Sequence, residues 1–164
     1  MRVAHLVATV LGVGHLRPAP GTWGSLIALP LAYGILVSGG WVALLVCGIL
    51  AFAAGLWATA QETRGKADHD PSEIVIDEVV GQWIALMPVA YGSAMMGVTP
   101  ERLWPGWLAA FVLFRLFDVT KPWLVGWADQ RSDALGVMLD DVIAGVFAAV
   151  AVIALAALFH LVLM

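Results

Sequence analysis

The sequence has few charged residues and a single cysteine. Charged residues make up 12% of its 164 positions, about half the ~25% that is usual in soluble domains. The eight Lys and Arg residues are too few and too scattered for a nucleic-acid surface, so we expect no nucleic-acid partner. The lone Cys47 excludes an internal disulfide and any cysteine-rich metal site.

Long stretches of apolar residues dominate the sequence instead. Hydrophobic residues make up 62% of the chain, and the mean hydropathy is +0.92. Because ~20 apolar residues in a helix cross the ~30 Å hydrocarbon layer, the chain has room for four or five spans. We therefore predict an all-α polytopic membrane bundle, one domain over residues 1–164, with short interfacial helices. The spans are expected near residues 24–38, 41–60, 74–96, 103–118 and 141–162.

Prolines and glycines predict where several of these spans begin and end. Residues 18–25 contain two prolines and two glycines, so we expect a loop there, with Thr22 or Ser25 capping the next helix. Residues 38–40 (Ser-Gly-Gly) predict a tight turn. The last span is expected to begin directly after Asp140 and Asp141. The apolar stretch 3–13 is short, which leaves open whether it spans or lies at the interface.

Basic residues predict the orientation of the spans. If these spans alternate in direction, six Lys and Arg residues lie on one side: Arg17, Arg64, Lys66, Arg115, Lys121 and Arg131. Only Arg102 falls on the opposite side with the 38–40 turn, Arg2 being left out because its helix need not span. The positive-inside rule then makes the six-residue side cytoplasmic. The polar segments 18–25, 61–78, 115–121 and 133–141 all fall on that side.

Four acidic residues at these helix starts predict a metal site. Asp77 and Asp141 each precede a glycine by four residues, Gly81 and Gly145, which places each acid and its glycine on one helix face. A glycine lets two membrane helices approach closely, and that approach would bring Asp77 and Glu78 close to Asp140 and Asp141. Mg²⁺ suits such a site, since it binds carboxylates, water and phosphate oxygens. The simpler alternative is that acids merely favour helix starts.

Basic and hydroxyl residues nearby suit an anionic ligand. Three charged residues share roughly one helix face: Arg115, Asp118 and Lys121. Either they bind phosphate, or Arg115 and Asp118 form an ion pair with each other. Because Pro122 follows Lys121, we expect an extended backbone at that lysine. Thr22 and Ser25, with the amides of the following helix turn, can cradle an anion. His69 is either a proton donor or a solvated loop residue. His5, His15 and His160 are interpreted as structural.

The motifs, in order, resemble the phosphatidylglycerophosphatase A family over residues 17–146. The matching stretches are Pro20–Leu26 (PGTWGSL), His69-Asp70 with Ile74–Gly81 (IVIDEVVG), Phe114–Asp118 (FRLFD) with Lys121–Trp123 (KPW), and Gly136–Gly145 (GVMLDDVIAG). The resemblance implies an all-helical, Mg²⁺-dependent enzyme of the bacterial inner membrane. Its implied reaction removes the terminal phosphate of phosphatidylglycerophosphate and leaves phosphatidylglycerol.

On this interpretation the site residues have three roles. The expected Mg²⁺ ligands are Asp77, Glu78, Asp118, Asp140 and Asp141. Arg115, Lys121, Thr22 and Ser25 are expected to bind the substrate phosphate, and Asp77, Asp140 or His69 to orient or deprotonate the attacking water. Two other classes remain open. A small ion or metabolite transporter would place acids near mid-span, and a structural membrane subunit would leave the clustered acids without a use.

Overall fold

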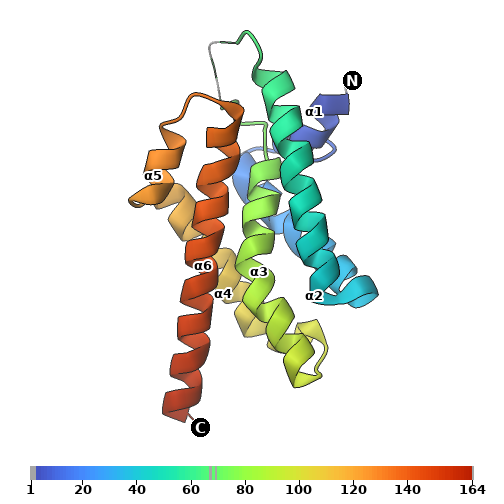
Figure 1. Ribbon diagram of the computed structural model, residues 1–164, viewed down its shortest axis with the longest axis vertical. Helices are drawn as coiled ribbons and strands as arrows, with labels where there is room; N and C mark the ends of the chain where they lie inside the picture. The colour runs from blue at the N-terminus through green and yellow to red at the C-terminus, as the bar shows by residue number, and fades with distance from the viewer. Residues whose placement is uncertain (1–2, 67, 69, 164) are drawn as a thin grey trace.

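The structure, a computed structural model, describes residues 3–66, 68 and 70–163, and all regular structure in these ranges is helical. Four helical segments are long and apolar enough to cross a membrane: α2 (Pro20–Thr63), α3 (Ile76–Met96), η2 with α4 (Pro100–Leu103 and Trp104–Thr120), and α6 (Ala134–Leu163). Three short helices complete the described fold: α1 (Val3–Ala8), η1 (Val13–His15) and α5 (Leu124–Asp129). The predicted all-α membrane bundle is confirmed (Figure 1).

The helix α2 is a hairpin of two helical arms. Gly40 has φ 69° and ψ −170°, a conformation outside the helical region that glycine adopts without strain. In Figure 1 the first arm runs away from the N-terminal end of the molecule and the second arm returns to it. The turn predicted at residues 38–40 is therefore present, and it divides α2 into two apolar arms of about 20 residues each.

The start of α2 differs from the expected loop. The helix already begins at Pro20, in the first helical position, where the missing N–H of proline costs nothing. Thr22 and Ser25 consequently lie inside the helix, and neither caps it. The Ser25 hydroxyl donates instead to the Gly21 carbonyl oxygen at 3.0 Å, within its own helix.

The start of α6 also differs from the prediction, because the helix begins at Ala134 and not after Asp141. The Asp133 carboxylate accepts a hydrogen bond of 2.9 Å from the Gly136 N–H, as an N-cap residue does. Met138 is fully buried, so packing continues the helix ahead of the acids. Asp140 and Asp141 therefore lie within the second turn of α6.

Central helix α3 holds the bundle together. Most of its side chains are buried between α2, α4 and α6. Trp83 donates its indole N–H to the Ala28 carbonyl oxygen at 2.9 Å, which joins α3 to the first arm of α2. The N-terminal segment adds a contact at the start of α3, where the Val75 N–H donates to the Ala8 carbonyl oxygen at 2.9 Å.

The helix starts that carry the acids lie at one end of the molecule. Figure 1 shows α1, the connections before α3 and α6, and the C-terminal end of α4 at this end, which we call the site end. The Gly40 turn and η2 lie at the other end. The predicted convergence of the four polar segments on one face is thus present.

Candidate active site

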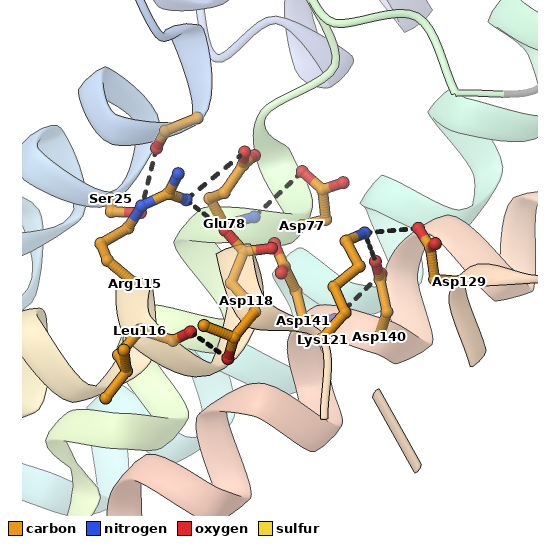
Figure 2. A network of polar contacts seen from close by, with 12 residues as sticks. Ser25, Asp77, Glu78, Arg115, Leu116, Asp118, Lys121, Asp129, Asp140 and Asp141 are labelled. Atoms are coloured by element: carbon orange, nitrogen blue, oxygen red, sulfur yellow. Dashed lines mark hydrogen bonds and ion pairs between the residues drawn. The ribbon is translucent and has the colours of Figure 1, made fainter. Parts of the chain in front are cut away.

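Five carboxylates from three helices meet at the site end. Asp77 and Glu78 come from the first turn of α3, and Asp118 from the last turn of α4. Asp140 and Asp141 come from α6. The oxygens form two overlapping triads, Asp77–Glu78–Asp141 and Asp118–Asp140–Asp141, each with its donor atoms within 4.8 Å of one another. The structure therefore brings together all five residues expected to bind a metal (Figure 2).

Two glycines allow this meeting. A Cβ atom built on Gly81 would lie 2.6 Å from the Asp141 carbonyl oxygen, closer than real Cβ atoms come. A Cβ atom on Gly145 would lie 3.1 Å from the Gly81 Cα atom and would clash with its carbonyl oxygen. The backbones of α3 and α6 thus touch at Gly81 and Gly145, and the predicted close approach is confirmed. Because Asp77 and Asp141 lie one turn before these glycines, the contact brings their carboxylates to one place.

The carboxylates are withdrawn from water and only partly paired. Asp77, Asp140 and Asp141 are 7%, 6% and 3% exposed. Within the described residues, Glu78 Oε2 and Asp141 Oδ1 are buried atoms without a hydrogen-bond partner. Unpaired buried carboxylate oxygens are costly, and divalent cations are a usual partner for them. An all-oxygen set favours Mg²⁺, Ca²⁺ or Mn²⁺ over Zn²⁺, so the residues fit the predicted magnesium ion.

Arg115 marks one side of the cluster. Its Nη1 atom lies 2.5 Å from Asp118 Oδ2 and 3.9 Å from Glu78 Oε1. The ion pair that was the alternative to phosphate binding is therefore formed in this structure. The first turn of α2 adjoins the same place, because a Cβ atom on Gly21 would lie 3.2 Å from Arg115 Nη1. Ser25 is fully buried near Arg115, and Thr22 is half-buried in that turn (Figure 2).

Lys121 marks the other side of the cluster. Its Nζ atom donates to Asp140 Oδ2 at 2.7 Å and also to Asp129. Burial lowers the pKa of Lys121, but the two carboxylate partners outweigh burial and raise the pKa above its usual value. The lysine therefore stays protonated at every pH at which the protein would be assayed.

The backbone at Lys121 is left-handed, with φ 44° and ψ 54°, and not extended as Pro122 led us to expect. The reason is the helix end, because the Lys121 N–H caps α4 by donating to the Phe117 carbonyl oxygen at 2.9 Å. Asp129, the second partner, was missed. It lies eight positions further along, at the end of α5, and only the folding of that short helix returns it to Lys121.

The histidines have different outcomes. His69 lies outside the described residues, so its role stays a prediction. His5 lies in the N-terminal segment, with Nδ1 3.2 Å from Glu62 Oε2 and Nε2 3.1 Å from His15 Nε2. The first contact joins α1 to the end of α2 and the second joins α1 to η1, which agrees with the structural interpretation of His5 and His15. The acidic partner Glu62, 57 positions away, gave no local signal.

Comparisons with known proteins agree in one family. A family model described as phosphatidylglycerophosphatase A matches residues 6–156. The chain is 36% identical over 152 residues to a phosphatidylglycerophosphatase A of Haemophilus influenzae, covering 92% of this chain and 87% of the relative. It is 34% identical over 146 residues to the phosphatidylglycerophosphatase A of Escherichia coli, covering 88% and 78%.

A third relative has a different name. A protein of Bacteroides thetaiotaomicron named putative phosphatidylinositol-3-phosphatase is 36% identical over 146 residues, covering 87% of this chain and 86% of the relative. No solved structure was found to match the chain.

Proposed function

The chain belongs to the phosphatidylglycerophosphatase A family, and we propose that it hydrolyses the terminal phosphomonoester of phosphatidylglycerophosphate to phosphatidylglycerol and phosphate. The observation that carries this proposal is the cluster of five carboxylates, three of them on buried residues, between Arg115 and Lys121. Such a cluster provides oxygen ligands for a cation, and the two flanking basic residues suit a phosphate.

We propose that Asp77, Glu78, Asp118, Asp140 and Asp141 bind Mg²⁺. The unpartnered oxygens of Glu78 and Asp141 support this assignment. When bound, Mg²⁺ would offset the negative charge of the cluster and polarise the phosphoryl oxygens of the substrate. The two triads share Asp141, which joins them into one cluster.

Arg115 and Lys121 are proposed to bind the terminal phosphate. Each is held by a carboxylate that is also a proposed ligand, Asp118 and Asp140 respectively. If Asp118 and Asp140 held a cation, Arg115 would be free to donate to phosphate oxygens, and Lys121 would keep Asp129 as a partner while donating to the phosphate. The N–H groups of the first turn of α2, around Thr22, lie on the Arg115 side and can add hydrogen bonds.

Water is the proposed nucleophile. Its oxygen forms the new bond to phosphorus, the bond from phosphorus to the glycerol oxygen breaks, and that oxygen leaves with a proton. We propose that a carboxylate oxygen of Asp77 or Asp140, or His69, takes the proton of the attacking water. Holding water between these carboxylates and the phosphate makes the attack effectively intramolecular.

We propose that the site faces the cytoplasm from the bacterial inner membrane. The supporting observation is that Arg17 and Lys66 lie at the site end through contacts with Ser72 and Glu62, whereas Arg102 lies in η2 at the other end. The transporter alternative is less well supported, because the acids lie at helix ends and not midway along a span.

The name of the Bacteroides relative makes phosphatidylinositol 3-phosphate a second candidate substrate. Both lipids carry a phosphomonoester on a polyol headgroup, so the same carboxylate cluster would serve either of them. Comparing the two lipids in one assay decides between them.

The test is phosphate release from phosphatidylglycerophosphate by the purified protein, with Mg²⁺ and with EDTA. We expect release only with Mg²⁺, and its loss in Asp77→Asn and in Asp140→Asn. Glu101→Gln is the matched control, because Glu101 is exposed in η2 at the other end. Release that persists in EDTA would falsify the metal assignment, and the absence of release from folded wild-type protein would overturn the activity.

A further inference from the structure

A cavity of about 310 Å³ lies beside Asp140, on the Lys121 side of the carboxylate cluster. One wall is formed by the last residue of α5, Asp129, and by the connection that follows it, with Gln130, Arg131 and Ser132. Asp68 and Asp70, from the connection before α3, also line it. Its volume is at the lower end of the ~300–1,000 Å³ range of small-molecule sites. Apart from Asp140 and the Lys121 partner Asp129, no lining residue that the structure describes has a role in the proposals above.

The cavity is continuous with the proposed phosphate site through two residues. Asp140 belongs both to the carboxylate cluster and to the cavity lining. Lys121 bonds Asp140 on the cluster side and Asp129 on the cavity side. Figure 2 shows Asp140, Lys121 and Asp129 in succession, on the side of the cluster away from Arg115. The cavity is therefore within reach of the atoms next to a phosphate that lies at the cluster.

The charge of the lining indicates which part of a lipid headgroup it suits. Four aspartates line the cavity, Asp68, Asp70, Asp129 and Asp140, against a single arginine, Arg131. That arginine is already paired to Asp133, with Nε–Oδ1 and Nη2–Oδ2 distances of 3.1 and 2.7 Å. An anion would meet mostly repulsion there. Hydroxyl groups can donate to the carboxylates and exchange hydrogen bonds with Gln130 and Ser132.

The position of α5 allows a membrane lipid to reach this cavity. Trp123 precedes α5 and Trp127 lies within it, and the two are 84% and 55% exposed; α5 ends at Asp129 of the cavity wall. Tryptophan at the end of a membrane helix favours the level of the lipid headgroups. A headgroup in the cavity would thus stay connected to acyl chains that remain in the bilayer.

We propose that the cavity binds the headgroup glycerol of the substrate through its one free hydroxyl, while the anionic phosphodiester that follows lies outside the acidic lining, toward the membrane. Gln130 and Ser132 then select a phosphate carried on a polyol over a phosphate attached directly to diacylglycerol. The inference rests on the proposed phosphatase activity and adds the part of the substrate that the carboxylate cluster does not recognise.

The test compares two lipids that share the phosphomonoester but differ in the polyol, phosphatidylglycerophosphate and phosphatidic acid. We expect wild-type protein to prefer phosphatidylglycerophosphate. Gln130→Ala with Ser132→Ala should lower kcat/KM for that lipid about tenfold, as the loss of one or two net hydrogen bonds does, and leave phosphatidic acid hydrolysis unchanged. Both side chains are exposed, so the fold should tolerate the change, which a thermal melt checks. Gln61→Ala, an exposed glutamine of α2 outside the cavity, is the matched control.

The outcomes separate the two proposals. An equal loss on both lipids, an unchanged kcat/KM on both, or a wild-type protein with no preference overturns the cavity assignment while the phosphatase activity stands. A folded wild-type protein that hydrolyses neither lipid overturns the activity and, with it, this inference.

Discussion

At Asp141 the demands of stability and of the proposed function conflict. It belongs to both carboxylate triads, is 3% exposed, and has one buried oxygen without a partner in the described part of the chain. A buried carboxylate among other carboxylates is unfavourable until a cation arrives. Folding alone does not account for such a residue, whereas the proposed cation would.

Replacing Asp141 should separate these two effects. We expect Asp141→Asn to lower Mg²⁺-dependent phosphate release by more than ~100-fold, because even residues that only support metal ligands cost 10–100-fold. The same change should stabilise the metal-free protein by about 1 kcal/mol, since it removes one charge from a crowded buried site. Thermal melts in EDTA and phosphate-release assays measure the two effects. A metal-free variant less stable than wild type would contradict this account of Asp141.

The sequence identified the site residues whose charge is costly in a membrane. The five acids stood out because acids are rare in apolar helices, and the structure brings all five together. The partners Asp129 of Lys121 and Glu62 of His5 were missed. They lie in polar segments where an acid is ordinary, and only the tertiary fold selects them.

At the scale of elements, the crossing of α3 and α6 determines the geometry of the site. Gly81 meets the backbone of Asp141, and Gly145 meets the backbone of Gly81. The Phe114 ring of α4 packs against the same point. The site therefore depends on a contact between the backbones of α3 and α6, and a side chain at Gly81 or Gly145 would prevent that contact.

Gly81→Ala should push these two helices apart. The added methyl group would overlap the Asp141 carbonyl oxygen and the Phe114 ring, so we expect a destabilisation of ~1–3 kcal/mol. The Mg²⁺ concentration needed for half-maximal activity should rise, because the carboxylates of the two helices separate. Thermal melts and a Mg²⁺ titration of phosphate release are the measurements.

The control for Gly81→Ala is Gly34→Ala. Gly34 lies in the first arm of α2 with open space at its Cβ position, so alanine there should be neutral or slightly stabilising. If both variants behave alike, the close contact of α3 and α6 does not control the site.

Helix interiors were predicted better than helix ends. Apolar length located every long helix, but α2 begins at Pro20 and α6 at Ala134, both earlier than expected. The sequence at both helix starts, glycine-rich in α2 and polar in α6, is typical of a loop. In α6 the burial of Met138 favours the helix over a loop. Tertiary packing outweighs the local turn propensity of these residues. Which residues pack together cannot be read from the local sequence.

At the scale of the whole molecule, chemistry and charge are concentrated at one end. The carboxylate cluster, the cavity and most of the basic residues lie at the site end, while Arg102 lies at the other. A lipid phosphatase with this arrangement reaches substrate in one leaflet only. Its orientation in the membrane therefore decides which leaflet it can serve.

The basic residues predict that the site end faces the cytoplasm, and the single native cysteine makes this measurable. In a Cys47→Ala background, Ser72→Cys places an exposed thiol at the site end and Thr99→Cys places one at the other end. A membrane-impermeant maleimide added to intact bacterial spheroplasts should label Thr99→Cys and leave Ser72→Cys unlabelled, whereas lysed membranes should label both. Retained phosphate release in each variant shows that the fold is intact. The reverse labelling pattern would place the site on the outer face of the membrane. The basic residues at the site end would then serve substrate binding and would not report the orientation of the protein.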